Sequence, residues 1–281
     1  MVARFVKSAL KNLSFKENKM KKSIIVLTAL LTGAAAFSQS LTGYEIMKKA
    51  DEVPTAKTSS YTATMTLTDK KGQTRVREVI EKEMEFPGST KTIIVFTTPK
   101  DVSGVGYLTI SYDEDANGNK KDSDNWLYMP AMKKVRRISG SDSGGDFMGT
   151  DFTYDDMGDR GLNKDNYELL GEENVDGVAC YKVECRAKDT TEKNPRRVVW
   201  IGKDNFMLYK AQFFDRQNEL QRELKCSDIK KIDGFWTTGK MLMKNVQKEH
   251  TTLIEMKDVK YGVALDETLF SVSALEKGRV R

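Results

Sequence analysis

The sequence predicts a mostly β fold of the α+β class, with about ten or eleven antiparallel strands and one or two short helices. Three observations support this prediction. The segment Tyr61–Thr68 alternates strictly between apolar residues and threonines. Short polar turns separate successive apolar segments, as in hairpins. One long irregular segment, Ser139–Met157, fits neither the helical nor the strand period.

The first predicted element after the N-terminal region is a helix over Leu41–Val53, with a rough apolar stripe and Pro54 at its end. The alternating segment Tyr61–Thr68 then predicts a half-exposed strand, because alternate side chains of a strand point to opposite faces. Asp69–Gly72 is expected to form a hairpin turn. Further strands are predicted over Thr74–Phe86, Lys91–Thr98, Gly106–Tyr112 and Trp126–Met129.

Strands resume after the irregular segment and are joined by short polar turns. They are predicted over Tyr167–Leu170, Val178–Ala187, Arg197–Ile201, Met207–Asp215, Leu220–Ile232, Phe235–Asn245 and Thr251–Val259. The turns Asn174–Gly177, Gly202–Asn205, Asp215–Asn218 and Asp233–Gly234 are rich in Asn, Asp and Gly. Such spacing predicts an antiparallel meander. A curved open sheet of this kind needs a helix or a lid across its mouth.

Residues 1–38 are expected to be a signal segment rather than part of the fold. Met20–Lys22 forms a basic start, Ser23–Phe37 is apolar, and small residues precede a cleavage position before Gln39. The alternative is an uncleaved anchor, but the apolar stretch is shorter than the roughly 20 residues of a membrane-spanning helix. We therefore expect a start at Met20 and a single domain over residues 39–281.

The basic composition of the chain comes mostly from the signal segment. That segment holds seven Lys/Arg and one acid, so its removal takes the net charge from +5 to −1. The charge of the remaining chain gives no support to nucleic-acid binding.

The irregular segment Ser139–Met157 is expected to be a lid or binding loop. Glycines and aspartates break regular structure there, yet apolar side chains are frequent. Single residues of this kind are more often ordinary core, but beside a glycine-rich cover the cluster indicates an apolar pocket. The candidate lipid-binding and lid residues are Trp126, Tyr128, Met129, Phe147, Met148, Phe152, Tyr154 and Met157.

The strand GVGYLTISYDED and the following segment Asp124–Met157 resemble the LolA-like outer-membrane lipoprotein-sorting proteins, of the LolA/LolB fold group. The resemblance extends from about Leu41 to the final LDETLFSVSALEKG. It implies an unclosed β-barrel covered by helices, whose concavity binds acyl chains. It further implies a monomeric periplasmic carrier or chaperone of the Gram-negative envelope, without a cofactor. Its partners would be lipid or lipoprotein acyl chains, an inner-membrane exporter and an outer-membrane acceptor.

Charged residues flank the irregular segment. Lys133, Lys134, Arg136 and Arg137 are candidates for contact with lipid head groups or with an acidic partner, although a solvated face is the commoner explanation. The acids Asp142, Asp146, Asp151, Asp155, Asp156 and Asp159 could pair with this basic stretch and hold the lid down.

The loop from Asp113 to Asp124 imitates a calcium site. Asp113, Asp115, Asn117 and Asp124 fall at ligand positions, with Gly118 at the turn. The flanking strands and the Asp in the last position argue against calcium, so no metal is expected. Asx- and Gly-rich hairpins reach this spacing by chance.

The three cysteines after the signal segment are expected to be buried and free. Cys180 and Cys185 lie five apart on one predicted strand and so point to opposite faces. Either could pair with Cys226 instead.

Catalysis has little support in the sequence. The single histidine, His250, lies in a polar strand without a nucleophile motif, and no GxSxG, HExxH, CxxC or P-loop occurs. We therefore expect a protein that is not an enzyme. Two alternatives stay open: a secreted hydrolase on a β scaffold with paired carboxylates, and an envelope interaction module with a packed, dry core.

The signal segment gives the first prediction. In the native host, the mature protein should begin at Gln39, because Ala36 and Ser38 place small residues at positions −3 and −1 of the cleavage site. N-terminal sequencing checks this, and retention of residues 1–38 would contradict it.

Overall fold

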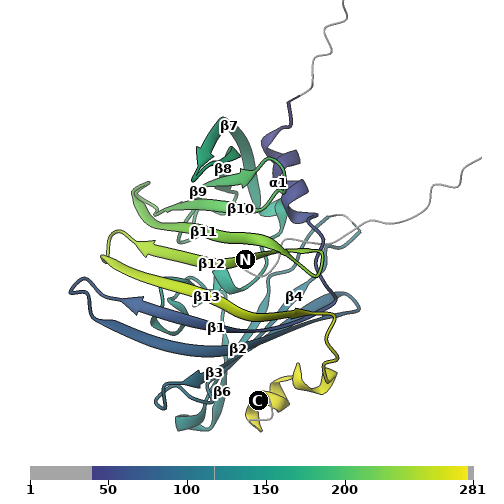
Figure 1. Ribbon diagram of the computed structural model, residues 1–281, viewed down its shortest axis with the longest axis vertical. Coiled ribbons are helices and arrows are strands. Elements are labelled where there is room, and N and C mark those ends of the chain that lie inside the picture. The colour runs from purple at the N-terminus through teal and green to yellow at the C-terminus, as the bar shows by residue number, and fades with distance from the viewer. Residues whose placement is uncertain (1–39, 117, 278–281) are drawn as a thin grey trace, which may run out of the picture.

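The computed structural model describes residues 40–116 and 118–277, and within them thirteen strands form one antiparallel sheet (Figure 1). The sheet order is β6-β5-β4-β3-β2-β1-β13-β12-β11-β10-β9-β8-β7. The two outer strands, β6 and β7, do not pair, so the sheet is unclosed. The strands are β1 (Thr58–Thr68), β2 (Thr74–Phe86), β3 (Ser89–Thr98), β4 (Gly106–Tyr112), β5 (Asp124–Met129), β6 (Lys134–Ile138), β7 (Asp165–Val175), β8 (Val178–Ala187), β9 (Arg196–Gly202), β10 (Leu208–Phe214), β11 (Leu220–Ile232), β12 (Phe235–Asn245) and β13 (His250–Tyr261).

The helices are short. Two are α-helical, α1 (Gly43–Asp51) and α2 (Val272–Glu276). Five are 3₁₀ turns: η1 (Pro130–Met132), η2 (Phe147–Gly149), η3 (Asp155–Met157), η4 (Leu162–Lys164) and η5 (Glu267–Leu269). None of the helices in residues 40–116 and 118–277 is long and apolar enough to cross a membrane.

The predicted mostly β, unclosed antiparallel architecture is confirmed. The sheet has more strands than expected, and β6 was not among the predicted ones. Its sequence, KVRRI, has no apolar alternation. Charged residues are typical of an edge strand, where they discourage pairing with other chains. A search for alternating apolar residues therefore does not detect this strand.

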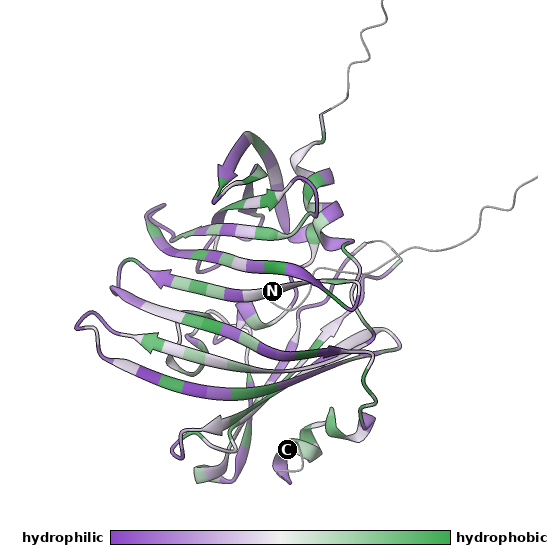
Figure 2. Cartoon of the chain, viewed as in Figure 1, coloured by the Kyte–Doolittle hydropathy of each residue, from purple (hydrophilic) through white to green (hydrophobic). Residues whose placement is uncertain are grey.

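Each strand divides its side chains between a concave and a convex face, and the alternation of hydropathy along the strands is visible in Figure 2. On β3, Ile94 and Phe96 belong to the concave core, whereas Ile93 and Val95 face the convex side. The C-terminal segment with α2 covers the convex cluster through Phe270 and other apolar side chains. The described sheet therefore carries one apolar core on its concave face and two smaller apolar clusters on its convex face.

Helix α1 lies against β7, β8 and β9 near one edge of the sheet (Figure 1). A capping box starts it: Thr42 Oγ1 accepts from Glu45 N at 3.2 Å, and Glu45 Oε2 accepts from Thr42 N at 2.8 Å. A Cβ at Gly43 would lie 2.9 Å from the backbone of Glu168, so glycine allows the helix to approach β7 directly. Ile46 and Met47 point into the concave core.

The irregular segment Ser139–Met157, which contains the 3₁₀ turns η2 and η3, packs against the concave face. Phe147 N donates to Phe152 O at 2.7 Å and closes a compact loop. Both side chains are buried, with 1% of Phe147 and 0% of Phe152 exposed. The Phe147 ring centroid lies 5.0 Å from that of Tyr107 in an edge-to-face contact. The segment thus contributes core side chains to the sheet.

The expectation about the cysteines is met within the described residues: Cys180, Cys185 and Cys226 are free and buried. Cys185 lies in the concave core, and Cys180 lies in a separate cluster on the other face. Burial raises the pKa of Cys185 and of Cys226 to about 12. The predicted signal segment lies outside the described residues.

Packing of Phe147 generates a stability prediction. Phe147→Ala should destabilise the fold by about 3–5 kcal/mol, because it leaves a cavity under the irregular segment. Met132→Ala is the control, since the Met132 side chain is 56% exposed and its loss should change stability by at most about 0.5 kcal/mol. Denaturant unfolding measures both. Equal stabilities would show that the segment is not part of the core.

Candidate functional site

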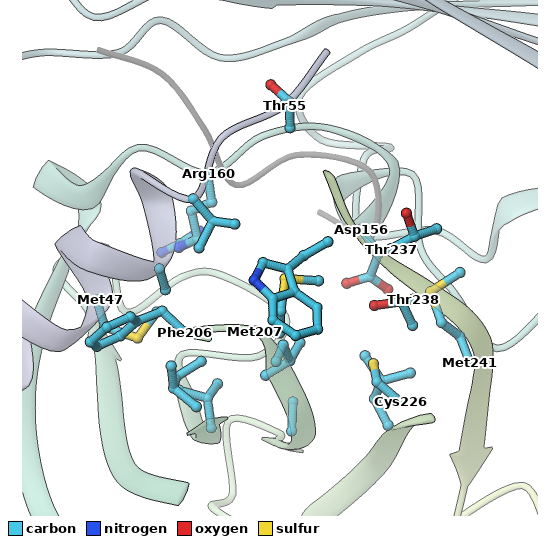
Figure 3. Close-up of a pocket in the computed structure, with 18 of the residues that line it drawn as sticks. Met47, Thr55, Asp156, Arg160, Phe206, Met207, Cys226, Thr237, Thr238 and Met241 are labelled. Carbon is cyan, nitrogen blue, oxygen red and sulfur yellow. The ribbon is translucent and has the colours of Figure 1, made fainter. Parts of the chain in front are cut away.

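An apolar cavity of about 160 Å³ lies between α1 and the concave face of the sheet (Figure 3). The strands β8 to β13 supply most of its wall. Its apolar lining includes Met47, Ala50, Phe152, Val199, Ile201, Phe206, Met207, Leu208, Ala211, Phe213, Leu224, Cys226, Met241, Met243 and Met256. Methionine is the commonest side chain in this set, and its flexible, polarisable thioether adapts to guests of varied shape.

Strand alternation explains how β12 contributes to the cavity. Met241 and Met243 are buried on the concave side, whereas Leu242 between them is 38% exposed on the other side. The sequence MLM within β12 therefore places two sulfur-containing side chains in the cavity wall and one leucine outside it.

One part of the cavity wall carries carboxylates. Glu81 and Glu83 lie on the inward face of β2 and are only 7% and 6% exposed. Burial raises the pKa of Glu81 to about 8, and a hydrogen bond from Tyr61 opposes part of this shift. Glu83 accepts a hydrogen bond from Thr92 Oγ1 at 3.1 Å. Two acids in an apolar cavity are costly to retain, which marks them as functional candidates.

A second part of the wall is built from paired charges. Arg160 holds Asp165 with two hydrogen bonds, Nε to Oδ2 at 2.8 Å and Nη2 to Oδ1 at 2.7 Å. Arg197 also pairs with Asp165. Arg160, Arg197 and Asp156 line a neighbouring polar cavity of about 430 Å³ as well, so they separate the two spaces. Figure 3 shows Arg160 and Asp156 beside the apolar lining.

Arg222 anchors the irregular segment to β11. Its guanidinium pairs with Asp156, and it donates to the carbonyl of Asp151 at 3.0 Å and to Asn194 Oδ1 at 2.9 Å. Burial alone would raise the pKa of Asp156, but the Arg222 guanidinium holds it below its usual range. A buried pair of this kind is costly to break, because one charge would remain uncompensated.

The single histidine also anchors the segment. His250 Nδ1 lies 2.6 Å from Asp151 Oδ2, and Thr252 Oγ1 donates to the same oxygen at 2.7 Å. The backbone N of Asp151 in turn donates to Thr252 Oγ1 at 3.0 Å. All these contacts tie the segment to β13, so the geometry gives His250 a structural role.

Comparison with known proteins places this chain in a family. A family model described as "-like: Uncharacterized protein" matches residues 88–277. No curated protein matches the chain. The solved structure of a DUF1329 family protein from Desulfovibrio piger is 33% identical, covers 83% of this chain and 97% of its own, and superposes with a TM-score of 0.77.

A second solved structure, described as an outer membrane lipoprotein-sorting protein domain from Vibrio parahaemolyticus, is 28% identical. It covers 83% of this chain and 98% of its own, with a TM-score of 0.76. The chain belongs to the DUF1329 family, and its structure matches those of LolA-like lipoprotein-sorting domains. A LolA superfamily protein from Nitrosomonas europaea, at 18% identity, 84% and 100% coverage and a TM-score of 0.63, shows the same fold.

The structure disperses the lipid-binding candidates of this LolA-like chain. Phe152 lines the apolar cavity. Phe147, Met148, Tyr154, Met157 and Met129 belong to or pack against the concave core without lining that cavity. Trp126 and Tyr128 pack on the convex face, against the cluster that the C-terminal segment covers. Alternation along β5 explains why these candidates lie on different faces of the sheet: Tyr128 and Met129 are adjacent in the strand, so their side chains point in opposite directions.

The basic candidates of the LolA-like chain lie at the η1 turn and on β6. Lys133 and Lys134 are exposed. Arg136 pairs with Asp142 at 2.6 Å, and Arg137 pairs with Asp124. The other candidate acids have different partners: Asp146 contacts Lys193 and Lys248, Asp151 contacts His250, Asp155 contacts Ser143, Asp156 contacts Arg222, and Asp159, just after the segment, contacts Lys120. The acids hold the segment down, but mostly through partners outside the basic stretch.

The calcium-like spacing does not bring its described members together. Asp124 accepts a hydrogen bond from Tyr112 Oη at 2.6 Å and pairs with Lys121 at 3.1 Å. Asp115 Oδ1 accepts from Asn119 N at 2.9 Å within a turn, and Asn117 lies outside the described residues. Across residues 40–116 and 118–277, no group of three or more His, Cys, Asp or Glu is placed to hold a metal ion.

Sequence reasoning identified Phe152 but missed the other residues that line the cavity of this LolA-like chain. In the segment VIEKEM, Glu81 and Glu83 alternate with Val79 and therefore point to the same inward face of the strand. Two acids on the apolar face of a predicted strand are the sequence pattern that could have identified them. The cavity methionines Met241 and Met243 carry the same kind of signal on β12.

The raised pKa of Glu81 predicts a pH-dependent stability. The folded state keeps this proton up to about pH 8, whereas the unfolded chain loses it near the usual 4.5, so the free energy of unfolding falls as pH rises between these values. Glu81→Gln should remove this loss, and its melting temperature should rise relative to wild type from pH 4.5 to pH 8. A difference of about 2–4 °C is expected for each kcal/mol gained.

Glu78→Gln is the control for this series, because Glu78 lies exposed on the same strand. If the difference in melting temperature between Glu81→Gln and wild type does not change between pH 4.5 and pH 8, the raised pKa of Glu81 is contradicted.

Proposed function

We propose that this LolA-like chain is a carrier or chaperone that binds the acyl chains of a lipid or lipoprotein and holds them for transfer toward the outer membrane. The observation that carries the proposal is the apolar, methionine-rich cavity between α1 and the unclosed sheet. The lipoprotein-sorting description of the Vibrio parahaemolyticus relative supports it. The action is binding and release, without chemistry on the cargo.

The driving force is the removal of acyl surface from water. Burial of a hydrocarbon chain stabilises a complex by roughly 0.8 kcal/mol for each CH₂ group. An unbranched chain fits a wall of unbranched methionine side chains, since both adjust by rotation about single bonds. A wall of this kind favours apolar chains as a class over any one chain length.

The cavity must widen to accept such cargo. Its volume of about 160 Å³ is below the roughly 300–1,000 Å³ of typical ligand pockets. The segment Ser139–Met157 is held by the buried Asp156–Arg222 pair, whereas α1 has nine residues and contacts three strands near the sheet edge. In this proposal α1 moves to admit cargo and the irregular segment stays in place.

Exported location and transfer partners follow from the same proposal. The carrier works in the periplasm of a Gram-negative envelope, after removal of its signal segment. It receives cargo from an inner-membrane exporter and delivers it to an outer-membrane acceptor, as a monomer. The acyl chains need shelter between the two membranes, and the concavity provides it.

The identity of the cargo can be read directly. Mass spectrometry of organic extracts from protein purified out of the native periplasm should detect a bound lipid or lipoprotein.

Obstruction of the cavity provides the decisive test. Met241→Trp places a larger ring in the cavity wall and should weaken binding of a fluorescent acyl probe at least about tenfold, a loss of about 1.4 kcal/mol. Leu242→Trp is the matched control, because the neighbouring side chain faces outward. Fluorescence titration measures both affinities, and circular dichroism verifies folding. A folded Met241→Trp protein with wild-type affinity would exclude this cavity as the acyl site.

A further inference from the structure

The polar cavity that adjoins the apolar one has a volume of about 430 Å³, within the roughly 300–1,000 Å³ of typical ligand pockets. Its wall combines residues from strands near both ends of the sheet. Asn125 on β5 and Ile138 on β6 come from one end, and Arg197 on β9 comes from the other. The irregular segment adds Ser143 and Thr153. The polar cavity is therefore enclosed jointly by the two ends of the open sheet and by the segment that covers it.

The charges of this wall are balanced. Six acidic and six basic side chains of the described residues line the polar cavity. Arg222 pairs with Asp156. Arg160 pairs with Glu192 at 2.9 Å. A ligand with a net charge would compete with such ion pairs, and breaking a pair leaves one of its charges uncompensated. The wall therefore favours a neutral ligand.

Two deeply buried side chains of the wall have unused hydrogen-bonding capacity. Asn125 is 5% exposed, and its Oδ1 has no hydrogen-bond partner among the described residues. Arg222 is 3% exposed, and its Nε has no partner in the same part of the chain. Buried polar atoms of native proteins are nearly always hydrogen-bonded. One of these atoms accepts and the other donates, so a ligand that satisfies both must itself donate and accept.

Neighbouring contacts hold both side chains in place. Arg222 Nη2 donates to Asn194 Oδ1 at 2.9 Å, and Asn194 Nδ2 donates to Gln221 Oε1 at 3.1 Å. On the other side of the polar cavity, Asn125 lies within β5 and pairs directly with Thr109 of β4. Groups that are fixed before binding lose little conformational freedom when a ligand arrives. The polar wall is therefore positioned in advance.

The polar and apolar cavities meet at a shared wall. Phe213, Arg160 and Arg197 line both of them. The Arg222 guanidinium lies over the Phe213 ring, 4.5 Å from its centroid. Figure 3 shows Arg160 beside the apolar lining. A ligand whose chain fills the apolar cavity therefore has its head group at the border of the polar one.

We infer that the polar cavity is a head-group site for an amphiphile with a neutral polyhydroxyl head, such as a sugar, whose acyl chain lies among the cavity methionines. This inference rests on the proposed carrier function and narrows its cargo class. Each hydroxyl group donates one hydrogen bond and accepts two. A polyhydroxyl head therefore serves an acceptor such as Asn125 Oδ1 and a donor such as Arg222 Nε, and it leaves the ion pairs of the wall intact.

Competition binding tests the inference. A fluorescent acyl probe bound to the whole purified protein is displaced by dodecyl maltoside, dodecanol, dodecanoate or dodecylammonium, each below its critical micelle concentration. These four ligands have the same chain and different heads. Wild-type protein should bind dodecyl maltoside at least about tenfold more tightly than dodecanol, and neither charged ligand should show this preference. Free maltose, the head without a chain, should not displace the probe.

A substitution in the polar wall supplies the second part of the test. Asn125→Leu removes the unpartnered acceptor and keeps a side chain of similar volume. It should lower the maltoside preference at least about threefold, the effect of one lost hydrogen bond, and leave the affinity for dodecanol unchanged. Thr109→Val is the matched control, because Thr109 is 2% exposed and pairs directly with Asn125 but lines neither cavity.

Circular dichroism verifies the folding of both variants. If Asn125→Leu does not fold, Lys188→Met serves in its place, since Lys188 lines the polar cavity with an exposed side chain that is not part of the core. It removes a hydrogen-bond donor from the wall and should lower the same preference.

Several results would overturn the inference. Equal affinities for dodecyl maltoside and dodecanol would show that the polar cavity holds only water. Strongest binding of dodecanoate or dodecylammonium, or a maltoside preference that persists in a folded Asn125→Leu protein, would also reject the site. Displacement of the probe by free maltose would indicate a free saccharide instead of an amphiphile. Failure of dodecanol to displace the probe would reject the carrier function as well, which separates the two proposals.

Discussion

A curved sheet whose edge strands do not pair must cover its apolar concave face with chain that belongs to no strand. That constraint governs this molecule. Closed barrels satisfy it with their own side chains, but here β6 and β7 leave the sheet open. The chain answers with α1 near one edge and Ser139–Met157 across the face. The cavity is the space that these two covers leave unfilled.

The irregular segment and α1 are attached to the sheet by different kinds of interaction, and this difference bears on which of them can move. The irregular segment is fixed by charge: Arg222 and His250 each hold an aspartate of the segment in a buried setting. Helix α1 is held by a narrow apolar stripe and by the close backbone contact at Gly43. Breaking buried charge pairs costs more than sliding an apolar surface, so a binding cycle would use the helix.

Much of the architecture could be predicted from sequence, and the limits have physical causes. Strand alternation as in Tyr61–Thr68 reports which side chains share a face, and polar turns report antiparallel hairpins. The short charged strand β6 was not predicted, because its residues are typical of a sheet edge and not of a core. Most residues of the cavity wall were not predicted, because a sequence does not show which strands curve around the same space. Apolar residues of the irregular segment attracted notice by composition, yet only Phe152 among them reaches the cavity.

The three cysteines of this fold are buried and form no disulfide. Cys180 and Cys185 face opposite sides of one strand, all three thiols are buried, and their pKa values of about 11 to 12 keep them protonated at neutral pH. A protonated, buried thiol is a poor nucleophile and exchanges slowly with disulfides. Because the three cysteines form no disulfide, folding to this structure needs neither an oxidant nor a disulfide isomerase.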